Sequence, residues 1–370
     1  MKKHTFKRLF GYLKSYRLRL FLVLLFASVS TIFTVMAPFV IGKVTTTLFE
    51  SIRDGVFYWE TILWLLAALV GLYLISQFFS FLQGFHMAKI TANVMREIRS
   101  DIDSKMHRLK LDYYDTHTHG DILSVITNDV DMINNTVSQN LTSIVTQIIT
   151  AIGILLMMLT ISPKLTFIPI IMVPLSLLSA AGVMKSGGKH YERQQKLLGE
   201  LNGYIEEMYN GQQVVQAFSY QERAKEQFQA LNENLKNSSY KAETIAGAVS
   251  PITTFVNDMG YVICAAIGCL RALGGFITVG NVQAMLEYTR RFAEPFSSLA
   301  GMAGSFGAAK AAGDRIFALL DAEEELPEAE NGMIPEDRSG SVRFENVQFG
   351  YTPDRMLMNG VNLTVKPGQK

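Results

Sequence analysis

The chain has little charge for its length. Of its 370 residues, 18% are charged and 49% are hydrophobic, whereas about a quarter of the residues of a typical soluble protein are charged. The net charge is only +1, so no strong basic field surrounds the protein and nucleic acid is not an expected partner. The composition argues against a soluble protein, and the distribution of the few charges is more informative than their number.

Metal-binding and redox-active side chains are equally scarce. The two cysteines, Cys264 and Cys269, lie five residues apart in an apolar run and form no metal or redox motif, so we expect them to fill the core. His117 and His119 stand close together, but no third or fourth ligand follows nearby, and a turn explains them better than a metal site. The sequence predicts no metal site and no catalytic residue.

Long runs without any charge are the most prominent positive feature. They cover residues 20–42, 61–88, 132–163 and 165–184. About 20 mostly apolar residues suffice for a bilayer-spanning helix, so each run is long enough, and four such runs argue against the buried helices of a large soluble protein. Two weaker runs that carry charges follow. We therefore predict six spans, at about 20–42, 61–88, 138–161, 165–184, 247–270 and 279–301.

The N-terminus is basic, as in a secretory signal. The first apolar run, LFLVLLFASVSTIFTVMAPFVIG, has 23 uncharged residues, which is too long for the apolar core of a signal peptide. We expect a retained membrane helix. Before it, residues 1–17 interleave basic residues with Phe6, Leu9, Phe10, Tyr12 and Leu13. This pattern predicts an amphipathic helix at the membrane interface, in contact with membrane lipids, with a disordered tail as the alternative.

The basic residues lie on alternate sides of the predicted spans. Residues 1–20 contain seven Lys and Arg and no acidic residue, and the two long connections, 82–137 and 183–246, contain six and eight. The other connections are short and have few basic residues. The positive-inside rule places both termini and both long connections in the cytoplasm.

Both long connections show apolar residues at helical spacing with charges on the opposite face. We expect the membrane helices to continue into the cytoplasm as two helical hairpins, whose tips lie near residues 112–131 and 210–223. At 1.5 Å per residue, about 25 residues carry such a tip far from the bilayer, where a partner is expected.

These features together resemble the exporter class of ABC transporters, as a bacterial half-transporter of the multidrug type. The first tip, with YD, GDIL and TNDV motifs, is similar to the first coupling region of the family, and the second tip to its second coupling region. FITVGNVQAMLEYTRRFAEPF resembles the sixth membrane helix. The resemblance implies coupling roles for Tyr114, Asp115, Gly120, Asp121, Asn128, Asp129, Gly211 and Phe218. Gly120 and Asp121 are expected to shape the first turn, and Asp121 could equally be a helix N-cap.

The last residues resemble the first strands of an ABC nucleotide-binding domain. The resemblance implies a membrane domain over 18–318, a linker over 319–340 and the start of an α/β nucleotide-binding domain over 341–370. Tyr351 matches the aromatic residue that stacks on adenine, with a place in the β core as the alternative. ATP and Mg²⁺ are the implied cofactors, bound mostly by residues after Lys370, because no phosphate-loop motif precedes it. The sequence as given is not expected to hydrolyse ATP.

The expected fold is therefore an α-helical polytopic membrane protein with long cytoplasmic extensions, located in the bacterial cell membrane. The resemblance implies ATP-driven export of amphipathic drugs or other hydrophobic compounds by alternating access, with lipid or peptide export as the alternative. It also implies pairing with a second half-transporter, a different but similar half being preferred to a second copy. A carrier or channel is the rival class, but no inverted repeat is visible.

Charged residues within the last two spans are candidates for a substrate cavity. An acidic residue in a membrane helix is costly and normally faces the bundle interior or a water-filled cavity. Asp258 either pairs with an arginine of a neighbouring helix or faces a cavity that attracts cations, and Glu287 either pairs with Arg291 or joins that cavity. The candidate residues are Phe255, Asn257, Asp258, Tyr261, Glu287, Tyr288, Arg291 and Phe292. Phe255 and Tyr261 share a helix side with Asp258, although the aromatic residues could also face lipid.

Overall fold

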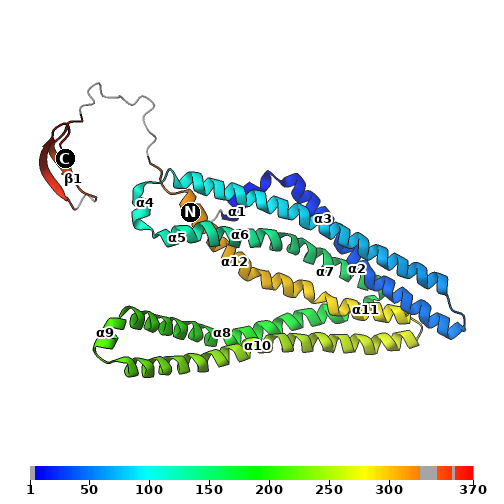
Figure 1. Cartoon of the computed structure of the whole chain (residues 1–370). Coiled ribbons are helices and arrows are strands. Elements are labelled where there is room, and N and C mark those ends of the chain that lie inside the picture. Colours follow the sequence, from blue (N-terminus) through cyan, green and yellow to red (C-terminus); the bar gives the residue numbers. More distant parts are fainter. Residues whose placement is uncertain (1–4, 326–339, 352–354, 370) are drawn as a thin grey trace. The chain divides into compact units, whose positions relative to one another are not determined.

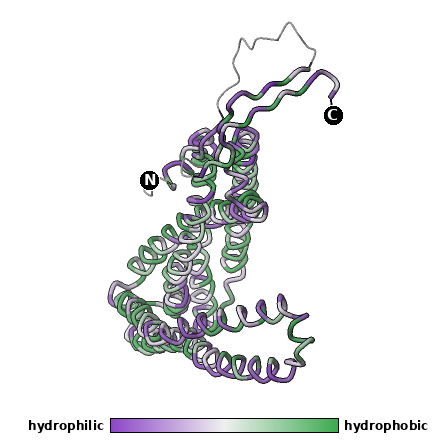
Figure 2. Tube along the Cα trace, turned by 90° about the vertical axis from the view of Figure 1, so that its left-hand side faces the viewer, coloured by the Kyte–Doolittle hydropathy of each residue, from purple (hydrophilic) through white to green (hydrophobic). Residues whose placement is uncertain are grey.

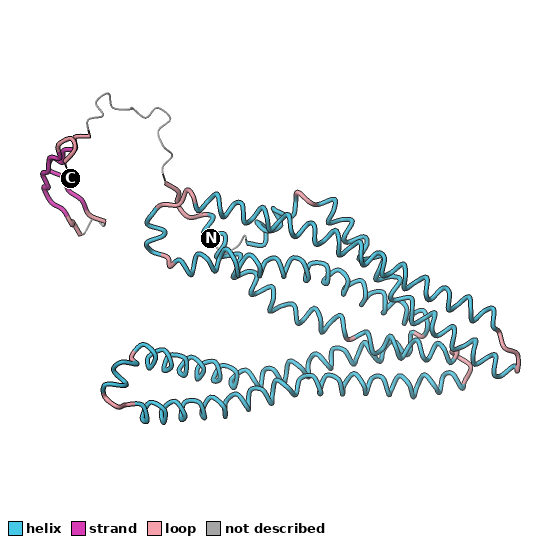
Figure 3. Tube along the Cα trace, in the orientation of Figure 1, coloured by secondary structure: helices cyan, strands magenta, loops and turns pink. Residues whose placement is uncertain are grey.

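The computed structural model describes residues 5–325, 340–351 and 355–369. These residues form two units, 1–322 and 323–370. The first unit is a bundle of long helices joined by short loops (Figure 3). The second unit contains two strands. Most of the expected linker, 319–340, and Lys370 lie outside the described residues.

The chain begins with α1 (Thr5–Lys14), followed by α2 (Arg17–Asp54) and α3 (Trp59–Met106). Helix α2 contains the first apolar run and ends at Gly55, whose φ of 68° is the left-handed conformation that commonly terminates a helix. Helix α3 continues well past its apolar part. This continuation is the helical extension that the amphipathic pattern predicted.

The chain then reverses through two short helices, α4 (Leu111–Thr116) and α5 (His119–Ser124). It returns through η1 (Val125–Asp129), α6 (Val130–Asn135) and η2 (Thr136–Asn140) into α7 (Leu141–Ile161). The segments η1 and η2 are π-helical, a form that occurs mostly as single turns within α-helices and often at functional sites. The first hairpin tip thus lies within the range that the sequence predicted.

The second hairpin consists of α8 (Pro163–Asn210), α9 (Gln212–Ala217) and α10 (Gln221–Leu273). Helices α8 and α10 run side by side, and α9 closes their tip (Figure 1). Hydrophilic residues recur along both arms of this hairpin (Figure 2), as expected for a part that leaves the bilayer. The predicted second tip, 210–223, contains α9.

The last helical segment is interrupted. Helix α11 (Val279–Phe292) starts where the side chain of Thr278 accepts a hydrogen bond from the backbone N–H of Asn281, at 3.1 Å, and α12 (Glu294–Leu320) follows after Ala293. Pro295 has no N–H to donate to the carbonyl four residues earlier, which explains the break. The predicted sixth span, 279–301, covers α11 and the start of α12.

Five helical stretches in the described part of the chain are long and apolar enough to cross a membrane: Arg17–Asp54, Trp59–Met106, His119–Ile161, Pro163–Asn210 and Gln221–Leu273. They contain the first five predicted spans. The interrupted α11–α12 segment is not among them, and its break leaves α11 with 14 residues, too few to span a bilayer by itself.

Two clusters of buried side chains hold the bundle. One lies around α1, α3, α6 and α12 and includes Ile90, Ile98 and Ile316, and the other joins α2, α7, α8, α10 and α11 around Met158, Leu165 and Tyr288. Helices α2 and α11 approach each other so closely at Gly42 and Gly280 that a side chain on either residue would overlap the backbone of the other helix. This contact fixes where α11 crosses α2.

The second unit is an antiparallel hairpin of β1 (Val342–Phe349) and β2 (Met358–Val365). Val342 pairs with Val365 and Phe349 with Met358, with irregular register between them. No side chain in the described part of this unit is buried. A two-stranded sheet without a core is marginal in water, so these strands require packing against further structure to be stable.

Candidate functional site

The first hairpin tip is joined to α12 by a bidentate ion pair. Asp129 of η1 is buried, with 5% of its side chain exposed, and Arg315 of α12 donates from Nε to its Oδ2 at 2.7 Å and from Nη2 to its Oδ1. This hydrogen bonding raises the pKa of the Arg315 guanidinium. Because α12 is the last described helix before the β strands along the chain, the pair ties the predicted coupling tip to the helix that precedes them in sequence.

The remaining predicted residues of the first tip have local roles. The N-cap of α5 is Thr118, whose hydroxyl accepts from the backbone N–H of Asp121 at 3.1 Å and donates to its carboxylate at 2.7 Å. Asp121 is therefore the third residue of α5, whose backbone N–H the Thr118 cap satisfies, and not the N-cap that we considered. Gly120 lies inside α5, so neither residue forms the turn itself.

Tyr114 and Asn128 brace the same tip. The Tyr114 hydroxyl donates to the Met106 carbonyl at 2.7 Å, and the Asn128 amide donates to the Ser124 hydroxyl at 3.1 Å. Asp115 is exposed. Nearby, His117 stacks on Tyr113 with ring centroids 4.1 Å apart. Hydrogen bonds and ring stacking thus hold the tip together, while Asp115 and the apolar Leu111 and Leu123 are exposed.

The second tip presents an apolar surface. Gly211 ends α8, and Phe218, which follows α9, has 79% of its surface exposed. Both line a hollow together with Met208, Val214 and Tyr220. An exposed aromatic residue at the tip of a long helical hairpin, far from the other helices, suits contact with a partner. We call the two long helical hairpins levers.

Helix α1 is fastened to its own bundle. Thr5 donates to Asp314, Arg8 forms an ion pair with Asp321 at 2.6 Å, and the Arg8 guanidinium lies 4.1 Å from the centroid of the Phe317 ring. Leu9 and Leu13 are buried in the first cluster. The apolar side of the expected interfacial helix is therefore partly covered by protein, which leaves Phe6 and Phe10 more exposed.

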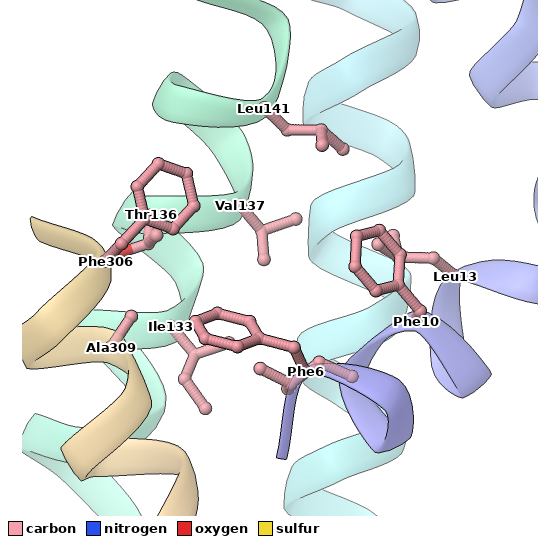
Figure 4. A pocket seen from close by; sticks show the side chains of 10 residues that line it. Phe6, Phe10, Leu13, Ile133, Thr136, Val137, Leu141, Phe306 and Ala309 are labelled. Carbon is pink, nitrogen blue, oxygen red and sulfur yellow. The ribbon is translucent and has the colours of Figure 1, made fainter. Parts of the chain in front are cut away.

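An apolar pocket lies beside α1 (Figure 4). Phe6 and Phe10 of α1, Val137 of η2 and Phe306 of α12 contribute to its wall, and Thr136 is its one polar residue. No charged residue in the described part of the chain lines this pocket and could bind a charged head group there. The pocket therefore suits a hydrocarbon chain and contains no catalytic group.

A second, polar pocket lies between α2, α10 and α11, within the predicted spans. Its lining consists of Pro38, Ile41, Tyr261, Gln283, Leu286, Glu287 and Arg290. Arg291 donates to Glu287 at 2.6 Å, as one of the two sequence interpretations expected. The Arg290 guanidinium lies 5.9 Å from the centroid of the Tyr261 ring. The structure thus brings together Tyr261, Glu287 and Arg291 of the predicted cavity set.

The other members of that set do not line this pocket. Tyr288 is fully buried and donates from its hydroxyl to the Val35 carbonyl at 2.7 Å, and Phe292 is buried against Phe296 at 5.3 Å between ring centroids. Both fill the core, so they face neither a cavity nor lipid in this structure. Phe255 and Asp258 are exposed, and Asn257 is half-buried. No described residue forms an ion pair with Asp258.

Tyr351 follows β1 in the second unit. Its ring lies edge-on to Phe349, with centroids 5.1 Å apart, and 82% of its surface is exposed. Within the described residues it fills no β core. The described residues contain no cluster of His, Cys, Asp and Glu that could hold a metal.

Sequence reasoning missed Gln283 and Arg315, and it noted Arg290 as a charge of the sixth span without including it in the cavity set. Arg290 carried a usable signal, because an arginine inside a membrane span is a functional candidate by default. The partnership of Arg315 with Asp129 carried none, since 186 positions separate the two residues.

Comparisons with known proteins agree with this architecture. Residues 20–296 match the family described as the ABC transporter transmembrane region. The chain is 32% identical over 99% of its length to an uncharacterized ABC transporter ATP-binding protein, YfiC, of Bacillus subtilis, and covers 60% of that protein. It is 35% identical over 82% of its length to a fatty acid ABC transporter ATP-binding/permease protein of Mycobacterium tuberculosis, covering 48% of it. It is 24% identical over 84% of its length to an ATP-dependent lipid A-core flippase of Syntrophus aciditrophicus, covering 51% of it.

Proposed function

Because this chain belongs to the ABC transporter family, as the multi-pass membrane region of an exporter half-transporter, we propose that it extrudes amphipathic drugs or other hydrophobic compounds by alternating access. The observation that carries the proposal is the pair of long helical hairpins, of which the first is tied to α12 by Asp129 and Arg315. A carrier has no use for such levers. They suit a protein that receives mechanical work from outside the bilayer.

ATP supplies that work in the proposed mechanism. Nucleotide domains that close on ATP and separate after hydrolysis push on α4, α5 and α9, and the rigid helices transmit the movement to the membrane part. Tyr351 is proposed to stack on the adenine, and residues after Lys370 are proposed to hold the phosphates and Mg²⁺. Both termini and both hairpin tips lie in the cytoplasm of a bacterial cell in this proposal, as the distribution of Lys and Arg predicts.

Lipid export is the second candidate. Two relatives are named as a fatty acid transporter and a lipid A-core flippase, and the apolar pocket beside α1 suits a hydrocarbon chain. A lipid and an amphipathic drug both enter such a transporter from the bilayer. The two candidates therefore share a route and differ in the head group and chain length that the cavity accepts.

Transport by the full-length protein together with its partner half tests the proposal. The complex is reconstituted in vesicles, and the uptake of an amphipathic dye and the flipping of a fluorescent lipid are each followed with ATP and with a non-hydrolysable analogue. ATP-dependent movement of the dye supports drug export, and movement of the lipid alone supports the second candidate. Movement of neither compound, with ATPase activity intact, contradicts both.

A further inference from the structure

Arg290 lies deep in the predicted sixth span without an anionic partner. It is eleven residues from the start of α11, which is about 16 Å along the helix, near the middle of a hydrocarbon core about 30 Å thick. In the described part of the chain no carboxylate lies within ion-pair distance of Arg290. The side chains of Arg290 and Gln283 are exposed in the structure, but an unpaired charge at this depth of a bilayer is costly, and such residues mark substrate or ion pathways.

The acidic residue closest along the helix is already occupied. Glu287 lines the same pocket one turn before Arg290, but it accepts a hydrogen bond from Arg291 at 2.6 Å. One carboxylate and two guanidinium groups leave this stretch of α11 with an excess positive charge. The Tyr261 ring, whose centroid lies 5.9 Å from the Arg290 guanidinium, does not neutralise the charge.

Gln283, a further polar residue of the pocket, also offers donors. Thr45 donates to the Oε1 atom of Gln283, which leaves the NH₂ group of Gln283 to donate into the pocket. The guanidinium of Arg290 offers further N–H groups in a planar fork that matches two oxygen atoms of a carboxylate or phosphate. The rest of the wall consists of the apolar side chains of Pro38, Ile41 and Leu286, the Tyr261 ring and the Glu287 carboxylate, which Arg291 already engages.

We propose that Arg290 and Gln283 bind the anionic head group, a carboxylate or a phosphate monoester, of an amphipathic substrate whose chain lies against the apolar wall. This assignment rests on the proposed export function and narrows its substrate class. It adds anionic amphiphiles to the cationic amphiphiles that Asp258 would attract. The two sites are separate, since Asp258 does not line this pocket. Arg290 acts here as a specificity-determining residue and takes no part in ATP hydrolysis.

Equilibrium binding to the full-length complex in lipid nanodiscs tests the assignment without ATP. Radiolabelled oleate is the probe, and oleyl phosphate, oleamide and oleylamine are the competitors, which share its chain and differ in head group. We expect oleate and oleyl phosphate to bind at least about tenfold more tightly than the other two, because charge-assisted hydrogen bonds are about twice as strong as neutral ones. The tighter of the two anions identifies the head group.

Arg290→Gln should weaken oleate binding by about tenfold or more and abolish the preference for anions. Arg290→Lys should retain part of it, because a lysine keeps the charge and loses the fork. Lys43→Gln is the matched control: Lys43 also lies over an aromatic ring, 4.9 Å from the Phe39 centroid, but does not line the pocket. Its oleate binding should equal that of the unaltered protein.

Three results would overturn the assignment. The first is equal binding of oleamide and oleate, and the second is unchanged oleate binding in Arg290→Gln. The third is an equal loss of binding for all four ligands in Arg290→Gln together with a lowered melting temperature, which would give Arg290 a structural role. Because the binding assay needs no turnover, a complex that binds oleate through Arg290 but moves no substrate contradicts only the proposed export. A complex that exports dyes and whose oleate binding is unchanged by Arg290→Gln contradicts only this inference.

Discussion

At the scale of single residues, charge inside the membrane part is the informative property. Asp258 is exposed on α10 and forms no ion pair with any described residue, and Tyr261 lies one turn away on the same helix. The structure thus provides no arginine partner for Asp258, which was one of the two sequence interpretations. We propose the other interpretation, in which the carboxylate faces the cavity and attracts amphipathic cations.

Asp258→Asn keeps the size and the hydrogen-bonding capacity of the side chain and removes its charge. We expect ATP-dependent uptake of a cationic dye by reconstituted vesicles to fall several-fold, because the attraction to the cation is lost. Uptake of a neutral substrate, binding of oleate and basal ATPase activity should be unchanged. Equal loss for cationic and neutral substrates, or a failure to assemble, would assign Asp258 a structural role instead.

At the scale of helices, the ion pair of η1 and α12 is asymmetric. Asp129 has 5% of its side chain exposed and Arg315 has 59%. Removing the arginine leaves a carboxylate uncompensated in the interior, whereas neutralising the aspartate leaves an arginine that water can solvate. Breaking a buried pair by removing one partner costs about 3–5 kcal/mol, and most of this penalty should fall on the first change.

We therefore expect Arg315→Ala to lower the melting temperature of the full-length complex clearly more than Asp129→Asn does. Combining Arg315→Ala with Asp129→Asn should restore part of the loss, because the combination no longer buries an unpaired charge. Exposed Lys310 of α12 provides a control, as Lys310→Ala should have little effect. Thermal unfolding followed by intrinsic fluorescence measures all four variants. Equal effects of the two single changes would show that the Asp129 carboxylate is not desolvated in the folded protein.

Much of the helical framework was predictable, because it depends on local pattern. Uncharged runs predicted the first four spans and a weaker run containing Asp258 predicted the fifth, and amphipathic spacing predicted both extensions and the ranges of their tips. The N-cap at Thr118 was also visible as a Thr three residues before an acidic residue, although the N-cap that we considered as an alternative was Asp121. The break at Ala293 was harder to predict, since Pro295 allows a kink as well as an interruption.

The candidate site was less predictable, because it depends on which side of each helix faces which neighbour. The order of residues on α11 does not show that Tyr288 and Phe292 turn into the core while Gln283, Glu287 and Arg290 line a pocket. That choice follows from the close contact of Gly42 with Gly280, which fixes how α11 lies on α2. Long-range contacts of this kind leave no periodic signal in a single sequence.

At the scale of the whole molecule, the chain provides one Arg290 pocket and one pair of levers. We propose that six membrane spans and one nucleotide-binding domain supply half of a transport pathway, so that the protein pairs with a second half. We propose a different but similar half as the partner, on the basis of the resemblance to bacterial exporters encoded as two chains. A homodimer would be symmetric and would duplicate every site, whereas a heterodimer would contain the pocket of this chain once.

The mass of the purified complex in detergent and the stoichiometry of oleate binding together test this proposal. Expressed alone in full length, the chain is expected to yield no stable, active dimer. Expressed with its partner half, it should yield a one-to-one complex in which Arg290→Gln removes a single oleate site per complex. A stable and active homodimer that loses two sites on the same substitution would contradict hetero-pairing while leaving the role of Arg290 intact. Mass and site number thus test the assembly separately from the pocket, because symmetry changes the count of sites and not their chemistry.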